Sequence, residues 1–310
     1  MKAAPFRLRS ADGVELSVRA FLPDGAPRAV LQIVHGMGEH AARYERFARE
    51  ATAAGWAVYA ADCRGHGETA ESAALLGHFA DADGWEKVVG DVHTVRERAA
   101  ASHSGLPYAL LGHSMGSFIA ADYLTRHGVG LRAAVLSGSA ASMGPLGFAL
   151  RAVARAECLR LGERARSPVL QKLLFGRFNQ AFEPARTPFD WLSRDPDEVD
   201  RYVADPRCGF VLSARSFGDM ARGLARYQRK DVLAKIPRAL PILLVAGELD
   251  PVGGRAGVEK LAAELRAAGL EHVDVRIWPE GRHEMLNEKN RDEVSRDLLA
   301  WLERRLRENA

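Results

Sequence analysis

The feature that most constrains this chain is a repeated alternation between short apolar runs and longer amphipathic stretches. The apolar runs are rich in β-branched residues and end in turn residues, and they cover 28–36, 56–65, 108–114, 132–140, 241–250 and 273–281. The stretches between them have apolar residues spaced three and four apart, as in 43–55, 85–100, 257–269 and 290–306. Nearly continuous apolar runs are typical of strands that are covered on both faces. The sequence therefore predicts an α/β fold with a mainly parallel, doubly wound sheet.

Two segments depart from this rhythm. Residues 6–23 alternate in polarity around Ala11-Asp12-Gly13, which is typical of a β-hairpin. Residues 141–210 contain no convincing strand, although a simple crossover needs far fewer residues. We therefore expect a helical cap, inserted before the strand that ends at Asp250. Its helices are expected at 144–162 and 168–182, and a helix near 212–228 leads back to the core. The expected organisation is a core over 1–140 and 212–310, interrupted by a cap over 141–211.

Composition excludes several classes of protein. The net charge of the 310 residues is +3, and no basic face is evident, so no nucleic-acid partner is expected. No apolar run reaches the 18 residues of a spanning helix, and the first residues lack the apolar core of a secretory signal. Cys63, Cys158 and Cys208 form no metal-ligand spacing and no C-x-x-C pair. We expect a cytoplasmic protein without metal or cofactor, and the oligomeric state stays open.

The stretch "GHSMG" places Ser114 directly after one of the apolar runs and before a helical pattern. Ligands bind open parallel sheets at the carboxyl ends of the strands, where Ser114 lies. A strand, a sharp turn and a helix around G-x-S-x-G are the context of a nucleophile elbow. The glycines at 112 and 116 fit a strained turn in which strand and helix approach closely. The sequence therefore predicts that Ser114 is a catalytic nucleophile.

A serine nucleophile needs a base, and the base needs a carboxylate that orients it. His283 follows the last predicted strand and Asp250 ends the strand before it, so both lie at the same sheet edge as Ser114. The order Ser, Asp, His is the one that this fold uses. His35, His40 and His66 lie on nearby loops and compete for the role of base, whereas the backbone direction should aim His113 elsewhere.

Acyl transfer also needs donors for an oxyanion. The amide of Met115, which follows the nucleophile, is one candidate. The loop "HGMGEH" at 35–40 follows the first parallel strand and offers the amide of Met37 as the other.

Five motifs together resemble the monoacylglycerol lipase and lysophospholipase branch of the α/β-hydrolases, often labelled serine aminopeptidase S33. They are "HGMGEHAARY" (35–44), "DCRGHGET" (62–69), "GHSMGS" (112–117), "GELDPV" (247–252) and "GRHEMLNE" (281–288). The resemblance spans about 28–137 and 212–306, and "TPFDWLSRD" and "DPRCGF" in the expected cap are similar to bacterial members.

This resemblance implies an α/β-hydrolase fold, with Ser114, Asp250 and His283 as the triad and Met37 and Met115 as the oxyanion pair. It also implies that Glu39 and Arg43 contact a polar headgroup such as glycerol. Met37 departs from the family pattern, which usually has a small residue there, and we expect its bulk to narrow the entrance to the acyl pocket.

Other features have plainer interpretations. The cluster in "DCRGHGE" is interpreted as a structural loop in which Arg64 pairs with a carboxylate. Glu284 and Glu288 are interpreted as helix-start and loop carboxylates.

In the expected cap, one helical stripe contains Leu146, Leu150, Val153, Ala154 and Leu161, with arginines elsewhere. This helix either packs on the core or lies transiently on a membrane surface. Four aromatic residues either line the acyl pocket or fill the cap: Phe175, Phe178, Phe189 and Trp191.

We therefore expect a serine esterase that hydrolyses monoacylglycerols or lysophospholipids. A carboxylesterase for small or xenobiotic esters is the alternative. An S33-type aminopeptidase and a non-catalytic ligand receptor are further hypotheses, and fold alone does not choose among them.

Overall fold

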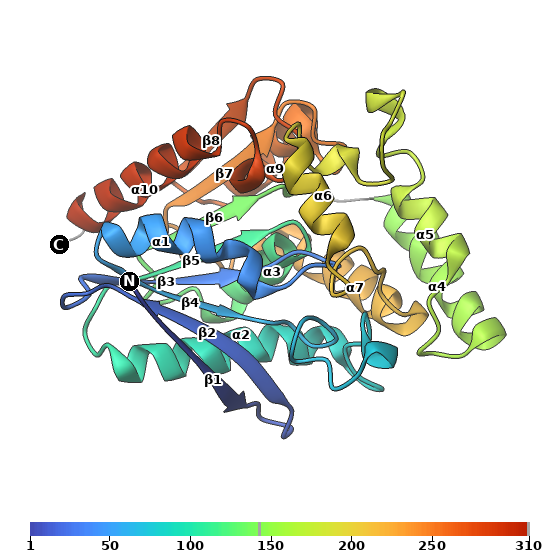
Figure 1. Cartoon of the computed structure of the whole chain (residues 1–310), viewed down its shortest axis with the longest axis horizontal. Helices are drawn as coiled ribbons and strands as arrows, with labels where there is room; N and C mark the ends of the chain where they lie inside the picture. Colours follow the sequence, from blue (N-terminus) through green and yellow to red (C-terminus); the bar gives the residue numbers. More distant parts are fainter. Residues whose placement is uncertain (142–143, 309–310) are drawn as a thin grey trace.

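One eight-stranded sheet runs through the computed structural model, which describes residues 1–141 and 144–308 (Figure 1). Its strands are β1 (Lys2–Arg9), β2 (Glu15–Leu22), β3 (Ala29–Val34), β4 (Trp56–Ala61), β5 (Tyr108–His113), β6 (Ala133–Ser137), β7 (Ile242–Gly247) and β8 (Val273–Trp278). The order across the sheet is β1-β2-β4-β3-β5-β6-β7-β8. β1 and β2 form the expected antiparallel hairpin, and β2 also pairs antiparallel with β4. Every other pair is parallel, so the prediction of a mainly parallel sheet is confirmed.

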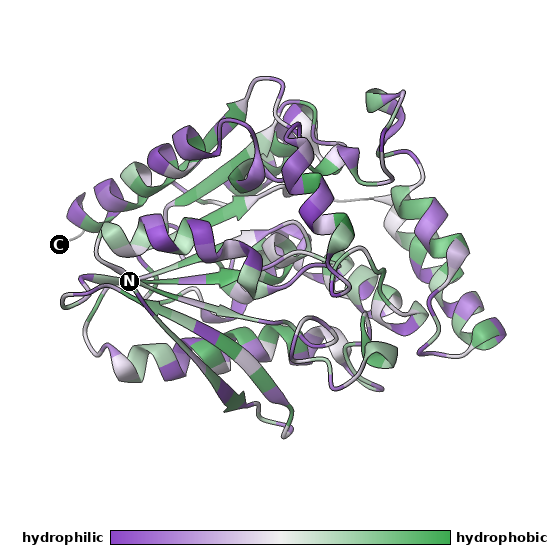
Figure 2. Ribbon diagram, viewed as in Figure 1, coloured by the Kyte–Doolittle hydropathy of each residue, from purple (hydrophilic) through white to green (hydrophobic). Residues whose placement is uncertain are grey.

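Helices cover both faces of this sheet. One face carries α1 (Glu45–Ala53) and α10 (Arg291–Glu308), and the other carries α2 (Gly84–Ser102), α3 (Met115–His127) and α9 (Gly254–Ala267). Alternate strand residues enter different cores, as Val30 packs with α2 and α3 while Leu31 packs with α1. This two-sided burial explains why the strand sequences are apolar at nearly every position, as the colouring of the strands in Figure 2 shows.

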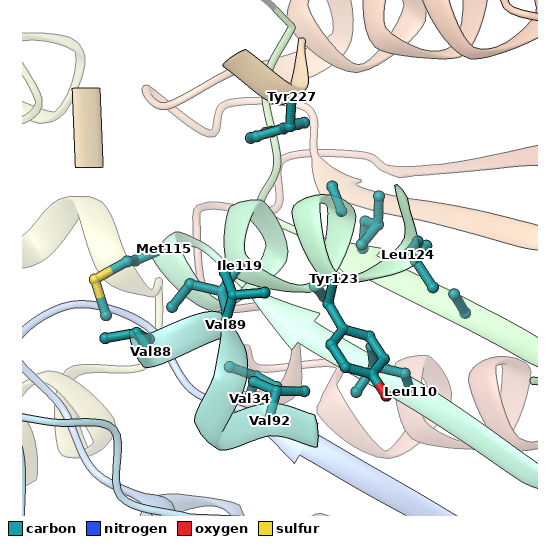
Figure 3. Packing of buried hydrophobic residues seen from close by; sticks show 14 of the residues in the cluster. Val34, Val88, Val89, Val92, Leu110, Met115, Ile119, Tyr123, Leu124 and Tyr227 are labelled. Atoms are coloured by element: carbon teal, nitrogen blue, oxygen red, sulfur yellow. The ribbon is translucent and has the colours of Figure 1, made fainter. Parts of the chain in front are cut away.

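The core beneath α2 and α3 fixes the position of the predicted nucleophile. Val88 and Val92 of α2 and Ile119 of α3 pack together over Val34 of β3 (Figure 3). Met115, the first residue of α3, is also fully buried in this cluster. The start of α3 is thereby anchored on the end of β5.

A group of helices lies beyond the carboxyl ends of the strands, at the right of Figure 1. They are α4 (Pro145–Leu161), α5 (Pro168–Phe175), α6 (Pro196–Ala204) and α7 (Ala214–Tyr227), followed by the short α8 (Lys230–Leu233). Five 3-10 turns complete the elements: η1 (Ala41–Tyr44), η2 (Ala73–Leu75), η3 (Gln180–Phe182), η4 (Asp190–Leu192) and η5 (Met285–Asn287). α4 packs on α7. Residues 142 and 143, at the start of the expected cap, lie outside the described part of the chain.

Two details of the cap differ from the sequence prediction. The helix expected over 168–182 ends at Phe175, because Gly176 follows and the side chain of Asn179 binds the backbone of Thr187 and Trp191 instead. On α4, Leu150 and Ala154 are buried as expected, but Leu161 is 40% exposed. The side chain of Leu146 lies outside the described residues.

Within the residues that the structure describes, no helix combines the length and the apolar character that crossing a bilayer requires.

Candidate active site

Ser114 lies in a strained turn between β5 and α3. Its backbone has φ 52° and ψ −122°, a combination that non-glycine residues rarely adopt. The Ser114 amide donates to the carbonyl of Ser137 at the end of β6 (2.8 Å), and its carbonyl accepts the amide of Ser117 in the first turn of α3 (2.8 Å). The turn therefore holds the Ser114 side chain at the carboxyl edge of the sheet, as a nucleophile elbow requires.

The two glycines of the motif are required by close packing. A Cβ at Gly116 would lie 2.1 Å from the carbonyl oxygen of Val34, and a Cβ at Gly112 would lie 2.3 Å from the carbonyl oxygen of Gly116. Both contacts are far below van der Waals distance, so β3, β5 and α3 can approach this closely only with glycine at these positions.

His283 and Asp250 meet in the loops after β8 and β7. The Nδ1 atom of His283 lies 2.9 Å from Oδ1 of Asp250, and the Val252 amide donates to the same oxygen (2.9 Å). Both side chains are buried. Burial opposes protonation of His283, but the Asp250 carboxylate outweighs it and raises the pKa of the imidazole above its usual value. Asp250 thus places the ring proton on Nδ1 and leaves Nε2 as the basic nitrogen.

The imidazole of His283 lies beside the elbow. A Cβ at Gly138 would lie 2.8 Å from Cε1 of His283, and Gly138 directly follows the Ser137 that binds the Ser114 amide. The Nε2 atom of His283 is buried and has no hydrogen-bond partner among the described residues, the Ser114 hydroxyl included. Catalytic hydrogen bonds of this kind are often long without substrate and tighten when it binds.

The other histidines near the elbow have different surroundings. The Nε2 of His35 accepts the Cys63 amide (2.8 Å) while its Nδ1 faces the Gly36 carbonyl (2.7 Å), so both ring nitrogens of His35 already contact the backbone. Burial lowers the pKa of His66 to about 3. His40 binds Asp205. Of the competitors for the role of base, none contacts Asp250 in the described structure.

His113 differs from the sequence expectation. We expected the backbone to aim it elsewhere, but its ring lies 4.8 Å from that of His283, centroid to centroid. Burial and the neighbouring His283 lower the pKa of His113 to about 4, so it is neutral and packs against the His283 ring.

The loop that contains Met37 lies against Ser114. A Cβ at Gly36 would lie 3.1 Å from the Ser114 Cβ, which places this loop within contact of the nucleophile. Within the described residues, the amides of Met37 and Met115 donate no hydrogen bond to the protein. Two free amides on either side of Ser114 are the kind of donor pair that binds an oxyanion.

Glu39 and Arg43 belong to an internal ion-pair network. Glu39 accepts the Gly36 amide (2.6 Å), the Tyr44 hydroxyl (2.9 Å) and Arg43 (2.8 Å), and Arg43 also binds both oxygens of Glu284 (2.7 Å each). Burial opposes ionisation of Glu39, but Arg43 outweighs it and lowers the pKa of this carboxyl to about 2. Glu284, which we interpreted from sequence as a helix-start carboxylate, thus joins the loop of His283 to the loop 35–40. This loop is predicted to bind the oxyanion and is called the oxyanion loop below.

Tyr202 of α6 is a site-bordering residue that sequence analysis missed. Its hydroxyl donates to the Gly38 carbonyl (2.8 Å), which also accepts the Gly209 amide (2.9 Å). The Arg43 guanidinium lies 4.8 Å from the centre of the Tyr202 ring. The cap thus holds the oxyanion loop directly, and no local pattern around Tyr202 signals this contact.

Trp191 packs on the face of His283. Their ring centroids are 5.1 Å apart, and the carbonyls of Trp191 and Leu192 accept the amides of His283 and Glu284. Phe175 and Phe178 also lie against the Trp191 ring. These aromatics join the cap to the predicted base, whereas Phe189 packs on Tyr202.

The loop "DCRGHGE" is structural, as expected for Arg64. The Arg64 guanidinium binds Asp91 (2.6 and 2.9 Å) and Asp12, and its side chain is almost fully buried. Glu288 is fully buried and pairs with Arg194 (2.9 Å).

Comparison with known proteins finds a matching family, related sequences and similar solved structures. The family model described as "Serine aminopeptidase, S33" matches residues 25–290. The chain is similar to a monoacylglycerol lipase of Mycolicibacterium smegmatis, with 31% identity over 94% of this chain and 93% of the relative. It is also similar to the monoglyceride lipase of Homo sapiens, with 28% identity over 96% and 90%. Among solved structures, a thermostable carboxyl esterase from Bacillus coagulans in complex with glycerol superposes with a TM-score of 0.89 at 30% identity, covering 98% of each chain.

Proposed function

The chain belongs to the serine aminopeptidase S33 family of α/β-hydrolases, and from this membership we propose that it is a serine hydrolase of carboxylic esters that acts on single-acyl lipids. Ser114 serves as nucleophile, His283 as general base and Asp250 as the carboxylate that orients the base. The observation that carries the proposal is the buried His283–Asp250 pair. Its imidazole lies against Gly138, next to the Ser137 that binds the Ser114 amide, and its Nε2 has no hydrogen-bond partner among the described residues.

Acylation begins when Nε2 of His283 takes the proton of the Ser114 hydroxyl and the oxygen attacks the ester carbonyl. The carbonyl oxygen becomes an anion, which accepts hydrogen bonds from the amides of Met37 and Met115. Collapse of this intermediate breaks the ester C–O bond, and His283 returns the proton to the leaving alcohol. The acyl group remains on Ser114.

Deacylation repeats these steps with water. His283 takes a proton from water, the hydroxide attacks the acyl-enzyme, and the proton then returns to the Ser114 oxygen as the carboxylic acid leaves. The Asp250 carboxylate stabilises the imidazolium in both halves of the reaction, because it already raises the pKa of His283.

The named activities of the relatives support a monoacylglycerol as substrate, and a lysophospholipid belongs to the same class of single-acyl lipids. The aromatic residues around Trp191 offer an apolar wall next to the base. In our proposal Glu39 and Arg43 contact the polar headgroup of the substrate. They act as a pair, because each is already bound to the other. A carboxylesterase for small esters is the second candidate, because the Bacillus coagulans carboxyl esterase superposes closely.

An aminopeptidase receives less support from the site. Binding a substrate ammonium group requires a carboxylate that is free to pair with it, but Glu39 and Glu284 are both already paired with Arg43. A non-catalytic receptor also receives less support, because this hypothesis gives no function to the strained turn at Ser114.

The cap carries the apolar surface that a transient contact with anionic lipid needs. Phe148 is 70% exposed and Leu159 is 84% exposed on α4, and Arg151 and Arg155 are exposed on the same helix. Apolar side chains combined with arginines are typical of helices that bind anionic lipid surfaces. A cytoplasmic location is part of this proposal and is supported by the free thiols of the three cysteines.

The proposal is tested by incubating a lipid extract with the protein and with Ser114→Ala and measuring the lipids by mass spectrometry. We expect monoacylglycerols or lysophospholipids to disappear and free fatty acid to accumulate only with the wild-type chain. A series of p-nitrophenyl esters of increasing acyl length separates the two candidates, because only a lipid hydrolase should prefer the longer chains. Wild-type turnover by Ser114→Ala would remove Ser114 from the mechanism.

A further inference from the structure

A second cluster of reactive side chains lies next to the oxyanion loop. His40, Asp205 and Cys208 each offer one metal-ligand atom, and these three atoms lie within 4.8 Å of one another. The Nε2 atom of His40 is 2.8 Å from Oδ2 of Asp205. None of the three residues has a role in the proposed hydrolysis.

The backbone holds the three side chains together from two directions. His40 directly follows Glu39 in the loop after β3 and is 4% exposed. Asp205 directly follows the last residue of α6, and the Cys208 amide donates to the Asp205 carbonyl (2.9 Å), which closes the turn between them. The Arg207 amide donates to Oδ1 of Asp205 (2.8 Å), which leaves the other oxygen directed to His40. The arrangement is thus built by the fold before any ion binds.

We propose that His40, Asp205 and Cys208 form a binding site for one thiophilic divalent cation of the Zn²⁺ type, with water as a fourth ligand. Imidazole nitrogen, carboxylate oxygen and thiolate sulfur are the donors that Zn²⁺ and Co²⁺ take in proteins. Tetrahedral bonds of the usual length place neighbouring N and O ligands about 3.4 Å apart. The distance between Nε2 of His40 and Oδ2 of Asp205 therefore has to increase by only about 0.6 Å.

The protonation states are compatible with binding. Burial lowers the pKa of His40, so its imidazole is neutral and has a lone pair for a metal. Burial raises the pKa of the Cys208 thiol to about 12, so the thiol is protonated without an ion. The cation displaces this proton: the S–H bond is exchanged for a sulfur–metal bond, and the proton passes to solvent.

Nearby charges limit the affinity. Arg207 contacts Asp205, and the Arg43 guanidinium acts electrostatically on Cys208. Two positively charged side chains would therefore repel the bound ion. Glu39 and Glu284 neutralise Arg43, and Glu68 lies 3.6 Å from Arg207. We therefore expect a reversible site, weaker than the closed four-ligand sites of structural zinc.

Such an ion would join two parts of the chain that meet at the oxyanion loop. His40 belongs to this loop, and Gly209, the residue after Cys208, already donates to its Gly38 carbonyl. An ion that binds only the folded chain raises the midpoint of thermal unfolding by mass action. The spacing of the cysteines did not indicate the site, because 165 residues separate His40 from Asp205.

The test is a titration of the metal-free protein with Co²⁺, monitored by absorption. Cobalt bound to a thiolate gives a near-ultraviolet charge-transfer band, whereas Co²⁺ on nitrogen and oxygen alone does not. We expect the band to saturate at one Co²⁺ per chain, to disappear when Zn²⁺ is added, and to be absent in Cys208→Ser. Cys158→Ser is the matched control, because Cys158 is a free thiol on α4, outside the cluster. The Co²⁺ complex of this variant should show an unchanged charge-transfer band.

A second variant keeps the test decisive if Cys208→Ser does not fold. His40→Gln retains a hydrogen-bond donor toward Asp205 but lacks the imidazole, and we expect it to weaken the binding of Co²⁺ at least tenfold. The thermal midpoint of each variant without metal verifies its fold. A band that does not saturate, that persists in Cys208→Ser, or that is lost in Cys158→Ser would overturn the proposal.

Discussion

At the residue scale, the backbone of Ser114 stores conformational strain at the point where chemistry is proposed. Glycine tolerates its positive φ, but serine and alanine do not. We therefore expect Ser114→Gly to be about 1 kcal/mol more stable than Ser114→Ala. Glycine relieves a backbone strain of roughly 1–3 kcal/mol, but it also increases the conformational entropy of the unfolded chain, which offsets part of the relief. Urea unfolding of both variants measures the difference.

Both substitutions should also reduce ester turnover by about 10³-fold or more, because each removes the hydroxyl. In Ser114→Gly, stability and activity would then change in opposite directions. Equal stability of the two variants would show that the turn at Ser114 is not strained.

The pH dependence of hydrolysis depends on His283. The base acts when neutral, so kcat/KM should rise as pH increases through the pKa of His283, which Asp250 holds above its usual value. Asp250→Asn removes this effect, and the acidic limb of the pH profile should move to lower pH while the rate at neutral pH falls about 10³–10⁴-fold.

The matched control for this prediction is Asp274→Asn. Asp274 lies in β8 and binds Trp301 (2.7 Å) and Arg305 (2.6 Å), away from the predicted base. Its substitution should leave the shape of the pH profile unchanged. A profile of Asp250→Asn that superposes on that of the wild-type chain would contradict the role of Asp250.

At the scale of elements, Arg43 joins the oxyanion loop to the loop that contains His283. Without Arg43, the buried carboxylates Glu39 and Glu284 would face each other unpaired. Arg43→Met should therefore cost about 3–5 kcal/mol of unfolding free energy at pH 7.

The sign of the pH effect distinguishes this explanation from a simple loss of packing. In the wild-type chain the pKa of Glu39 is lowered to about 2, so its stabilising contribution is present above pH 5 and is lost toward pH 2. In Arg43→Met we expect burial, no longer opposed by Arg43, to raise the pKa of Glu39, and protonation then relieves the unpaired carboxylate. The difference in unfolding free energy between the two proteins should thus shrink from pH 7 to pH 4.5, and a constant difference would exclude the charge explanation.

At the scale of the whole molecule, the helices α4 to α7 lie beyond the carboxyl edge of the sheet (Figure 1), and Phe148 and Leu159 of α4 are exposed. Replacing Phe148 and Leu159 by serine should reduce sedimentation of the protein with anionic phospholipid vesicles. Hydrolysis of a short, water-soluble ester should stay unchanged, because both side chains are exposed on α4, whereas Asp250 and His283 are buried.

Val129→Ser is the control for the vesicle experiment. Val129 is 81% exposed, but it follows α3 and precedes β6, at the end of the sheet opposite the cap. Its replacement should leave vesicle binding unchanged. Equal binding by the wild-type chain and the cap variant would show that α4 does not meet the lipid.

The strand positions could be predicted from the sequence because they depend on local patterns. Each expected apolar run contains one strand of the parallel part of the sheet, and the hairpin turns at Gly13 as the alternation indicated. Chain direction then places the ends of β5, β7 and β8 at one edge. That rule brought Ser114, Asp250 and His283 together in the prediction.

The tertiary structure alone decided the contacts between distant segments. Arg43 and Glu284 are 241 residues apart, and Tyr202 reaches Gly38 across 164 residues, so no periodicity links them. The approach of His113 to His283, the end of α5 at Phe175 and the exposure of Leu161 likewise depend on what packs nearby. Secondary structure follows from neighbours along the chain, whereas the partner of a buried charge follows from which loops the fold brings into contact.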